Sequence, residues 1–204
     1  SIALSGDFLA VGAWQESSGS EGPFNGSSEW AVAHAIPDAM GNSGAVYRFK
    51  RNGETWTQES YIKASNPGTN DYFGISISIT SDGSRIAVGA YGESSNATGI
   101  NGDETNNSAS FSGAVYVFSR SGTVWSQEAY IKASNNDAGD FFGETVSMSN
   151  NTLVVSAYAE DSNQTTISND NTSSSNYVDL GYNYRMTDFQ AALGVGQMER
   201  ITHQ

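Results

Sequence analysis

The sequence predicts an all-β protein of tandem four-stranded antiparallel blades, a partial β-propeller of about 2.5 blades followed by a short C-terminal α-helix. Three observations predict it. A group of motifs recurs at one constant offset, apolar and polar residues alternate with period two, and glycine-bearing turns separate the segments. With 204 residues, 37% of them hydrophobic, the chain is long enough to bury a core.

The repeat is the main evidence. Residues 44–49 (Gly-Ala-Val-Tyr-Arg-Phe) recur as residues 113–118 (Gly-Ala-Val-Tyr-Val-Phe), an offset of 69. The hexapeptide Tyr-Ile-Lys-Ala-Ser-Asn at 61–66 recurs unchanged at 130–135, again with an offset of 69. Aromatic and aliphatic residues dominate these matches, so low complexity does not explain them.

A third motif occurs three times, with spacings of 77 and then 67 residues, at 9–14, 86–91 and 153–158. The strands therefore persist while the loops vary in length. The motifs divide the chain into a partial blade at 1–66, a full blade at 67–135 and a partial blade at 136–160, within a repeat region of 1–165.

The full blade shows the expected strands. Within 73–80, Phe73, Ile75, Ile77 and Ile79 alternate with small residues, which is typical of a strand. Asp82-Gly83 marks a tight turn. Further strands are expected at 86–91, 113–120 and 125–133. Four antiparallel strands in tandem indicate a propeller blade; a β-solenoid and a β-sandwich are the alternatives.

These residues resemble a known family. Phe73-Gly74 followed by Val88-Gly89-Ala90-Tyr91 is similar to the FG-GAP repeat of integrin-α-like propellers, and residues 142–158 form the next copy, with Ser156 replacing a glycine. The resemblance covers about residues 1–165. It implies a propeller, an extracellular or cell-surface location, and a non-enzymatic recognition or adhesion role. A protein or glycan surface ligand, or neighbouring blades, would be the partners.

Composition excludes several other classes. The formal net charge of −13 argues against a nucleic-acid partner, because phosphate binding needs clustered basic residues. The chain has no cysteine and no apolar run long enough to span a membrane. No catalytic constellation is recognisable. Because the chain opens at Ser1 inside a strand-like pattern, we expect it to be a piece of a larger protein, with a blade face left uncovered.

One loop carries candidate metal ligands. Many FG-GAP blades resemble calcium sites at the junction of the first two strands, but here that junction is a short turn with too few oxygen ligands. The glycine-bearing loop 92–112 is richer in side-chain oxygens. Its candidate calcium ligands are Glu93, Asn101, Asp103 and Glu104. The alternative is a solvated polar loop.

The C-terminal part breaks the repeat. Residues 162–176 are rich in Ser, Asn and Thr and are interpreted as a polar linker, and 177–204 as a tail with a helix at about 188–201. Residues 177–201 resemble DegT/DnrJ-type sugar aminotransferases, which use pyridoxal phosphate. The resemblance places Asn183 and Arg185 near that cofactor.

Pyridoxal chemistry needs a Schiff-base lysine. No lysine segment of the chain resembles that site, so pyridoxal phosphate is not an expected cofactor. The alternative function is a catalytically incomplete aminotransferase fragment or fusion.

Overall fold

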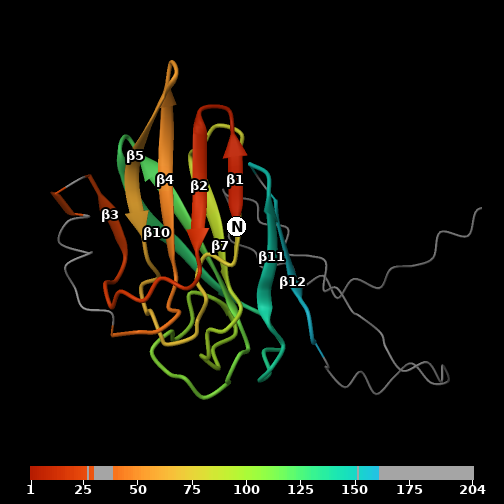
Figure 1. The fold of residues 1–204 in the computed structure, drawn as a ribbon. Helices are drawn as coiled ribbons and strands as arrows, with labels where there is room; N and C mark the ends of the chain where they lie inside the picture. The colour runs from red at the N-terminus through yellow and green to blue at the C-terminus, as the bar shows by residue number, and fades with distance from the viewer. Residues whose placement is uncertain (27, 30–38, 151, 161–204) are drawn as a thin grey trace, which may run out of the picture.

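The computed structural model describes residues 1–26, 28–29, 39–150 and 152–160, and within them the chain forms three antiparallel sheets (Figure 1). The first has the order β1-β2-β4-β5-β3 and the second β6-β7-β9-β10-β8. The third pairs β11 with β12. The strands are β1 (Ile2–Ser5), β2 (Phe8–Ala13), β3 (Pro23–Asn25), β4 (Ala45–Asn52), β5 (Thr55–Ile62), β6 (Ser76–Ile79), β7 (Arg85–Ala90), β8 (Gly99–Ile100), β9 (Ala114–Ser121), β10 (Val124–Lys132), β11 (Phe142–Met148) and β12 (Leu153–Ala157).

The predicted all-β class and antiparallel blades are confirmed. Each sheet is a meander, unlike the parallel coil of a solenoid, and the inner strands β1, β6 and β11 lie next to one another. Residues 2–62 form a five-stranded sheet, as many strands as the second blade has. The short outer strands β3 and β8 were not predicted, because two or three residues carry no readable alternation. The predicted helix at 188–201 lies outside the described residues.

The two five-stranded sheets share one register. Val11 pairs with Tyr47 and Tyr47 with Tyr61 in the first, as Val88 pairs with Tyr116 and Tyr116 with Tyr130 in the second. Even a bulge is repeated, because the pairing skips one glutamate on each outer strand, Glu59 in β5 and Glu128 in β10. The constant sequence offset therefore reflects a constant backbone pairing.

Tight turns close one end of each sheet. The turn between β6 and β7 contains Gly83 with φ +66°, and the turn between β9 and β10 contains Gly122 with φ +63°. These left-handed conformations suit glycine, which has no Cβ to clash. The Asp-Gly turn predicted at 81–84 is confirmed, and Asp82 Oδ1 accepts a hydrogen bond from the Ser84 amide (3.0 Å).

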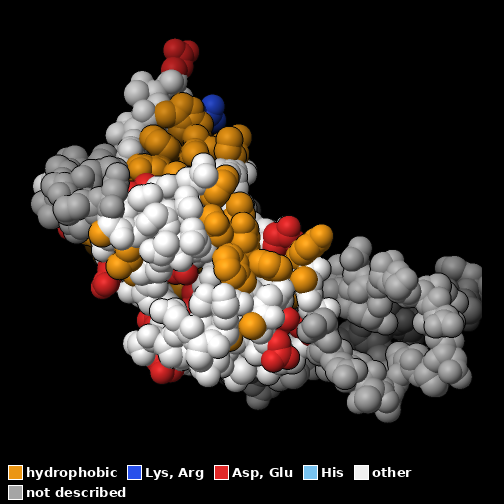
Figure 2. Space-filling model, turned by 60° about the horizontal axis from the view of Figure 1, so that its bottom comes forward, with side chains coloured by type: hydrophobic (Ala, Val, Ile, Leu, Met, Phe, Trp, Pro, Cys, Tyr) orange, Lys and Arg blue, Asp and Glu red, His pale blue; other side chains and the backbone are white. Residues whose placement is uncertain are grey.

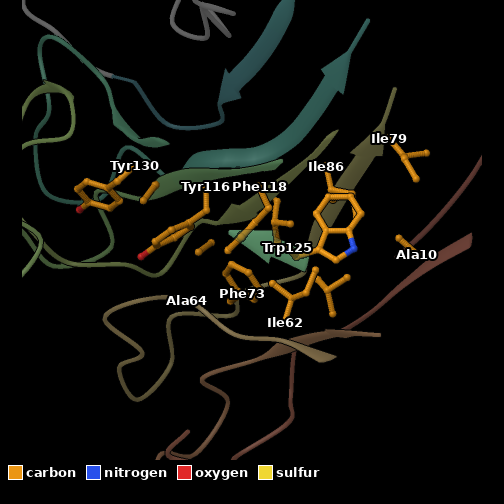
Figure 3. Packing of buried hydrophobic residues seen from close by; sticks show 14 residues of the cluster. Ala10, Ile62, Ala64, Phe73, Ile79, Ile86, Tyr116, Phe118, Trp125 and Tyr130 are labelled. Carbon is orange, nitrogen blue, oxygen red and sulfur yellow. The ribbon is translucent and has the colours of Figure 1, made fainter. Parts of the chain in front are cut away.

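The core lies between blades. We call the face of a blade that packs on the preceding blade its leading face, and the opposite face its trailing face. The leading face of the second blade buries Tyr116, Phe118 and Trp125 against Ala10, Val46 and Ile62 of the first (Figure 3). The trailing face of the second blade packs in the same way on β11 and β12. Blade-on-blade burial of apolar area is therefore the main stabilising term.

Two glycines let the blades approach closely. A Cβ at Gly12 would lie 2.1 Å from the Gly74 carbonyl oxygen, and one at Gly89 would lie 1.9 Å from that of Gly143. Hydroxyl groups connect the same places: Ser1 Oγ donates to the Gly74 carbonyl (2.7 Å) and Ser76 Oγ to the Gly143 carbonyl (2.8 Å). The glycines of the repeated motifs thus serve blade contact.

Candidate functional site

The long connections gather at one end of the sheets, and we call this end the loop face. In Figure 1, β2 and β5 run down toward it, and the tight turns lie at the opposite end. Its described residues are 14–26, 28–29, 39–44, 63–75, 91–113, 133–141 and 158–160. Loops held by a rigid sheet scaffold are where binding residues concentrate.

A buried lysine holds each of the two longest loops. Lys132 Nζ donates to Glu93 Oε2 and to Ser112 Oγ, both at 2.7 Å. Glu93 and Ser112 lie at the start and end of the β7–β9 connection, whereas Lys132 ends β10. Burial lowers the pKa of Lys132 although the Glu93 carboxylate opposes this shift. The ammonium group therefore fastens both ends of the loop to the outer strand.

The first blade repeats this arrangement. Lys63 Nζ donates to Glu16 Oε2 and to Ser43 Oγ, again both at 2.7 Å. The lysines and serines are 69 residues apart, but the glutamates are 77 apart. Sequence reasoning assigned both lysines to the strand repeats and missed these clusters. The available signal was the tripeptide Glu-Ser-Ser, which follows the third motif at 16–18 and at 93–95.

Polar residues join the Glu93 cluster to the first blade. Tyr116 Oη donates to Asn66 Oδ1 (2.6 Å), and Asn66 Nδ2 donates to Glu93 Oε1 (3.3 Å). Asp71 is buried and its Oδ2 accepts from the Gly68 amide (2.7 Å), which confirms its predicted role in the turn before β6. Burial, followed by the charge of Glu93, raises the pKa of Asp71 to about 7. The loop after β5 thus carries a titrating carboxyl group into the blade interface.

This carboxyl group predicts a pH-dependent stability. Its pKa is raised above the unfolded value of 3.8, so below that value both states are protonated and ionisation costs nothing. Between about 4 and 7 the unfolded chain ionises first, so the free energy of unfolding falls as pH rises, and above 7 the cost is complete. We expect Asp71→Asn, which keeps an acceptor for Gly68, to remove this fall. Urea unfolding at a series of pH values measures it.

The matched control is Asp7→Asn, because Asp7 pairs with Arg51 on the exposed surface. Subtracting each variant's pH profile from that of the unmodified chain isolates the single carboxyl group. A difference profile for Asp71→Asn as flat between pH 4 and 7 as that for Asp7→Asn would contradict the assignment.

The predicted calcium ligands are held by separate protein donors. Glu93 accepts from Lys132, Asn101 Oδ1 from the Tyr130 amide (3.0 Å), Asp103 Oδ1 from the Thr105 amide (2.9 Å) and Glu104 Oε2 from Ser65 Oγ (2.7 Å). In the part of the chain that the structure describes, no group of three His, Cys, Asp or Glu side chains is arranged to hold a metal ion. Calcium binding by this loop stays a prediction, which thermal melting with and without calcium tests. Asn183 and Arg185 lie outside the described residues.

A row of aromatic side chains crosses the loop face from blade to blade. Trp14 contacts Tyr72 with ring centroids 5.7 Å apart, Tyr72 stacks on Tyr91 at 5.0 Å, and Tyr91 contacts Phe141 at 5.7 Å. Phe141 lies 6.5 Å from Tyr158, whose side chain is 65% exposed. These spacings are those of favourable ring pairs. Figure 2, which brings the bottom of the molecule forward, shows hydrophobic side chains in a band across the surface.

Backbone strain accompanies this row. Tyr72 has φ +58° and Phe141 has φ +56°, which is unusual for bulky residues. The Tyr72 amide donates to the Asn42 carbonyl (3.0 Å), and the Phe141 amide to the Phe111 carbonyl (3.1 Å). Each bond fixes the aromatic residue to the loop of the preceding blade. Residues held in such conformations cluster at functional sites, so the row is the candidate binding site.

Antiparallel blades around adjacent inner strands, with loops on one end, define a propeller-type repeat module. The family model for the FG-GAP repeat matches residues 56–118 and 125–178, more than half of the chain. The chain therefore belongs to the FG-GAP repeat family, whose members are generally not enzymes. No curated protein matches the sequence.

The match also bears on the C-terminal interpretations. It continues through 162–176, interpreted above as a polar linker, and ends at residue 178. The comparisons give no support to the aminotransferase resemblance of 177–201, which stays a prediction. Among the described residues, no helix is long and apolar enough to cross a membrane.

Proposed function

We propose that the chain is a non-enzymatic extracellular recognition or adhesion module that contacts a protein or glycan surface ligand through its loop face. The observation that carries this proposal is the aromatic row from Trp14 to Tyr158, which continues across all three blades. Aromatic side chains offer large contact area at little conformational cost and dominate binding energy at interfaces.

Two further properties support the proposal. FG-GAP repeats are typical of extracellular proteins. The net charge of −13 disfavours polyanionic ligands and favours neutral or basic ones, which electrostatic steering would bring to the surface faster. The buried lysine clusters hold the loops that frame the aromatic row, so the face is preorganised for binding.

The test is a binding screen with the whole chain immobilised, against a glycan array and a panel of purified extracellular matrix proteins. For any ligand found, we expect Tyr158→Ala to raise the Kd at least about tenfold, or about 1.4 kcal/mol, because this ring is the most exposed in the row. Val124→Ala is the control, since Val124 is 56% exposed at the opposite, tight-turn end. A ligand whose affinity is unchanged by Tyr158→Ala would contradict the assignment of this face.

A further inference from the structure

The leading face of the first blade is an apolar sheet surface that the described residues leave uncovered. Leu4 is 64% exposed, whereas Ile79, its counterpart in the second blade, is 9% exposed. Trp56 is 39% exposed and its counterpart Trp125 is 2% exposed. The residues of this face are Ile2, Leu4, Leu9, Val11, Tyr47, Phe49 and Trp56.

Residue-by-residue equivalence shows what this surface is built to contact. Its members correspond through the shared register to Ile77, Ile79, Ile86, Val88, Tyr116, Phe118 and Trp125. Those residues pack on the trailing face of the first blade, where Ala10, Val46 and Ile62 lie. The uncovered face therefore has the composition of a blade interface and fits a trailing face. An exposed apolar patch of this kind marks an interaction site.

The chain itself carries an uncovered trailing face on its third sheet. Ser147 and Val154 are paired in β11 and β12 and correspond to Ser78 and Ala87 on the trailing face of the second blade. Their small side chains match the small residues that line the established interface. Thr145 likewise corresponds to Ser76, which donates to the Gly143 carbonyl of the following blade. Within the described residues, both ends of the blade array are thus complementary to each other.

Copy number makes closure possible. Each chain contributes three sheets, and two chains contribute six, which lies within the four to eight blades at which propellers close. A head-to-tail interface that closes on itself forms a finite ring, and one that does not close forms filaments.

We propose that two copies of this chain associate head to tail, the third sheet of each covering the leading face of the other's first blade, to close a six-bladed ring. One contact follows from the repeat. Ser78 Oγ accepts from the Met148 amide (2.8 Å), so Ser147 of one copy accepts from the Leu4 amide of the other.

The closing interfaces differ from the internal ones at one position. Ser156 stands where the second blade has Gly89, and its hydroxyl accepts from the Thr145 amide within its own sheet (3.1 Å). Its Cβ keeps the second copy from approaching as closely as Gly143 approaches Gly89. The closing interface is therefore wider and weaker, and the dimer dissociates on dilution.

Sedimentation velocity of the whole chain, from low micromolar to near-millimolar concentrations, tests this proposal. At about 0.15 M salt, where the Debye length is about 8 Å and the like charge of the copies is screened, we expect a shift from the 21.6 kDa monomer to a species of twice that mass. Leu4→Glu places a charge in both interfaces and should raise the dissociation constant at least tenfold. Val124→Glu, an equal change at an exposed site away from both faces, should leave it unchanged.

A trailing-face variant separates head-to-tail closure from other self-association. Ser147→Arg should weaken the dimer as Leu4→Glu does, because Ser147 is exposed on the third sheet. An equimolar mixture of the two variants should recover dimer, since one of its two interfaces is unmodified. A strict monomer at all concentrations overturns the proposal. So does a dimer insensitive to Ser147→Arg, which would indicate that two leading faces pack together, or a series of larger polymers.

Discussion

Gly89→Ala will lower the free energy of unfolding by about 3 kcal/mol, the upper part of the range for overpacked cores. The new Cβ would lie 1.9 Å from the Gly143 carbonyl oxygen and 2.3 Å from Ser76 Oγ. A backbone carbonyl in a neighbouring blade cannot rotate away as a flexible side chain can. The second and third blades must separate, which also disturbs the hydrogen bond from Ser76 Oγ to that carbonyl.

Urea unfolding followed by tryptophan fluorescence measures this loss. The matched control is Gly41→Ala, because a Cβ at Gly41 meets no atom within 4 Å. Its expected effect is within about 0.5 kcal/mol, as for most surface substitutions. Equal stabilities of the two variants would show that the blades do not approach each other at Gly89 as closely as described.

Lys132→Met will cost about 3–5 kcal/mol, the range for breaking a buried ion pair by removing one partner. The Lys132 side chain is fully buried and that of Glu93 is 1% exposed, so the remaining carboxylate would lie uncompensated. Ser112 would lose a partner at the same time. We therefore expect the β7–β9 connection to detach from the outer strand, together with a large fall in stability.

Two comparisons sharpen this result, again by urea unfolding. Arg51→Met breaks the exposed pair with Asp7 and should cost no more than about 1 kcal/mol. The double variant Lys132→Met, Glu93→Gln removes both charges and should recover part of the loss, because no buried charge remains unpaired. If Lys132→Met costs no more than Arg51→Met, the buried cluster does not hold the loop.

The strands were predictable and the candidate site was not, for a physical reason. Period-two alternation such as Phe73 to Ile79 and a repeat offset of 69 are local or pairwise properties of the sequence. The aromatic row depends instead on the placement of blades side by side, which brings Tyr91 and Phe141 together although they are 50 residues apart. The positive φ of Tyr72 is likewise imposed by a hydrogen bond to the preceding blade.

The loop 92–112 shows a second limit. A count of its oxygen-bearing side chains predicted calcium ligands, but a count does not reveal competing donors. The partner of Glu93 is Lys132, 39 residues away, and that of Glu104 is Ser65 in the other blade. Buried polar groups are nearly always paired in folded proteins, so such partners must be sought across the whole chain. The repeated Glu-Ser-Ser tripeptide was the one sequence signal for them.

The lysine clusters make this scaffold tolerant of grafting. Glu16 and Ser43 are 27 residues apart, whereas Glu93 and Ser112 are only 19 apart, yet both lysines hold their partners at the same 2.7 Å. The eight extra residues leave the anchor and the strand register unchanged. Lengthening a closed loop costs little entropy once its ends are fixed. A foreign peptide inserted between Glu93 and Ser112 would therefore be displayed on a preformed frame, and the loop face can diversify without any change in the blades.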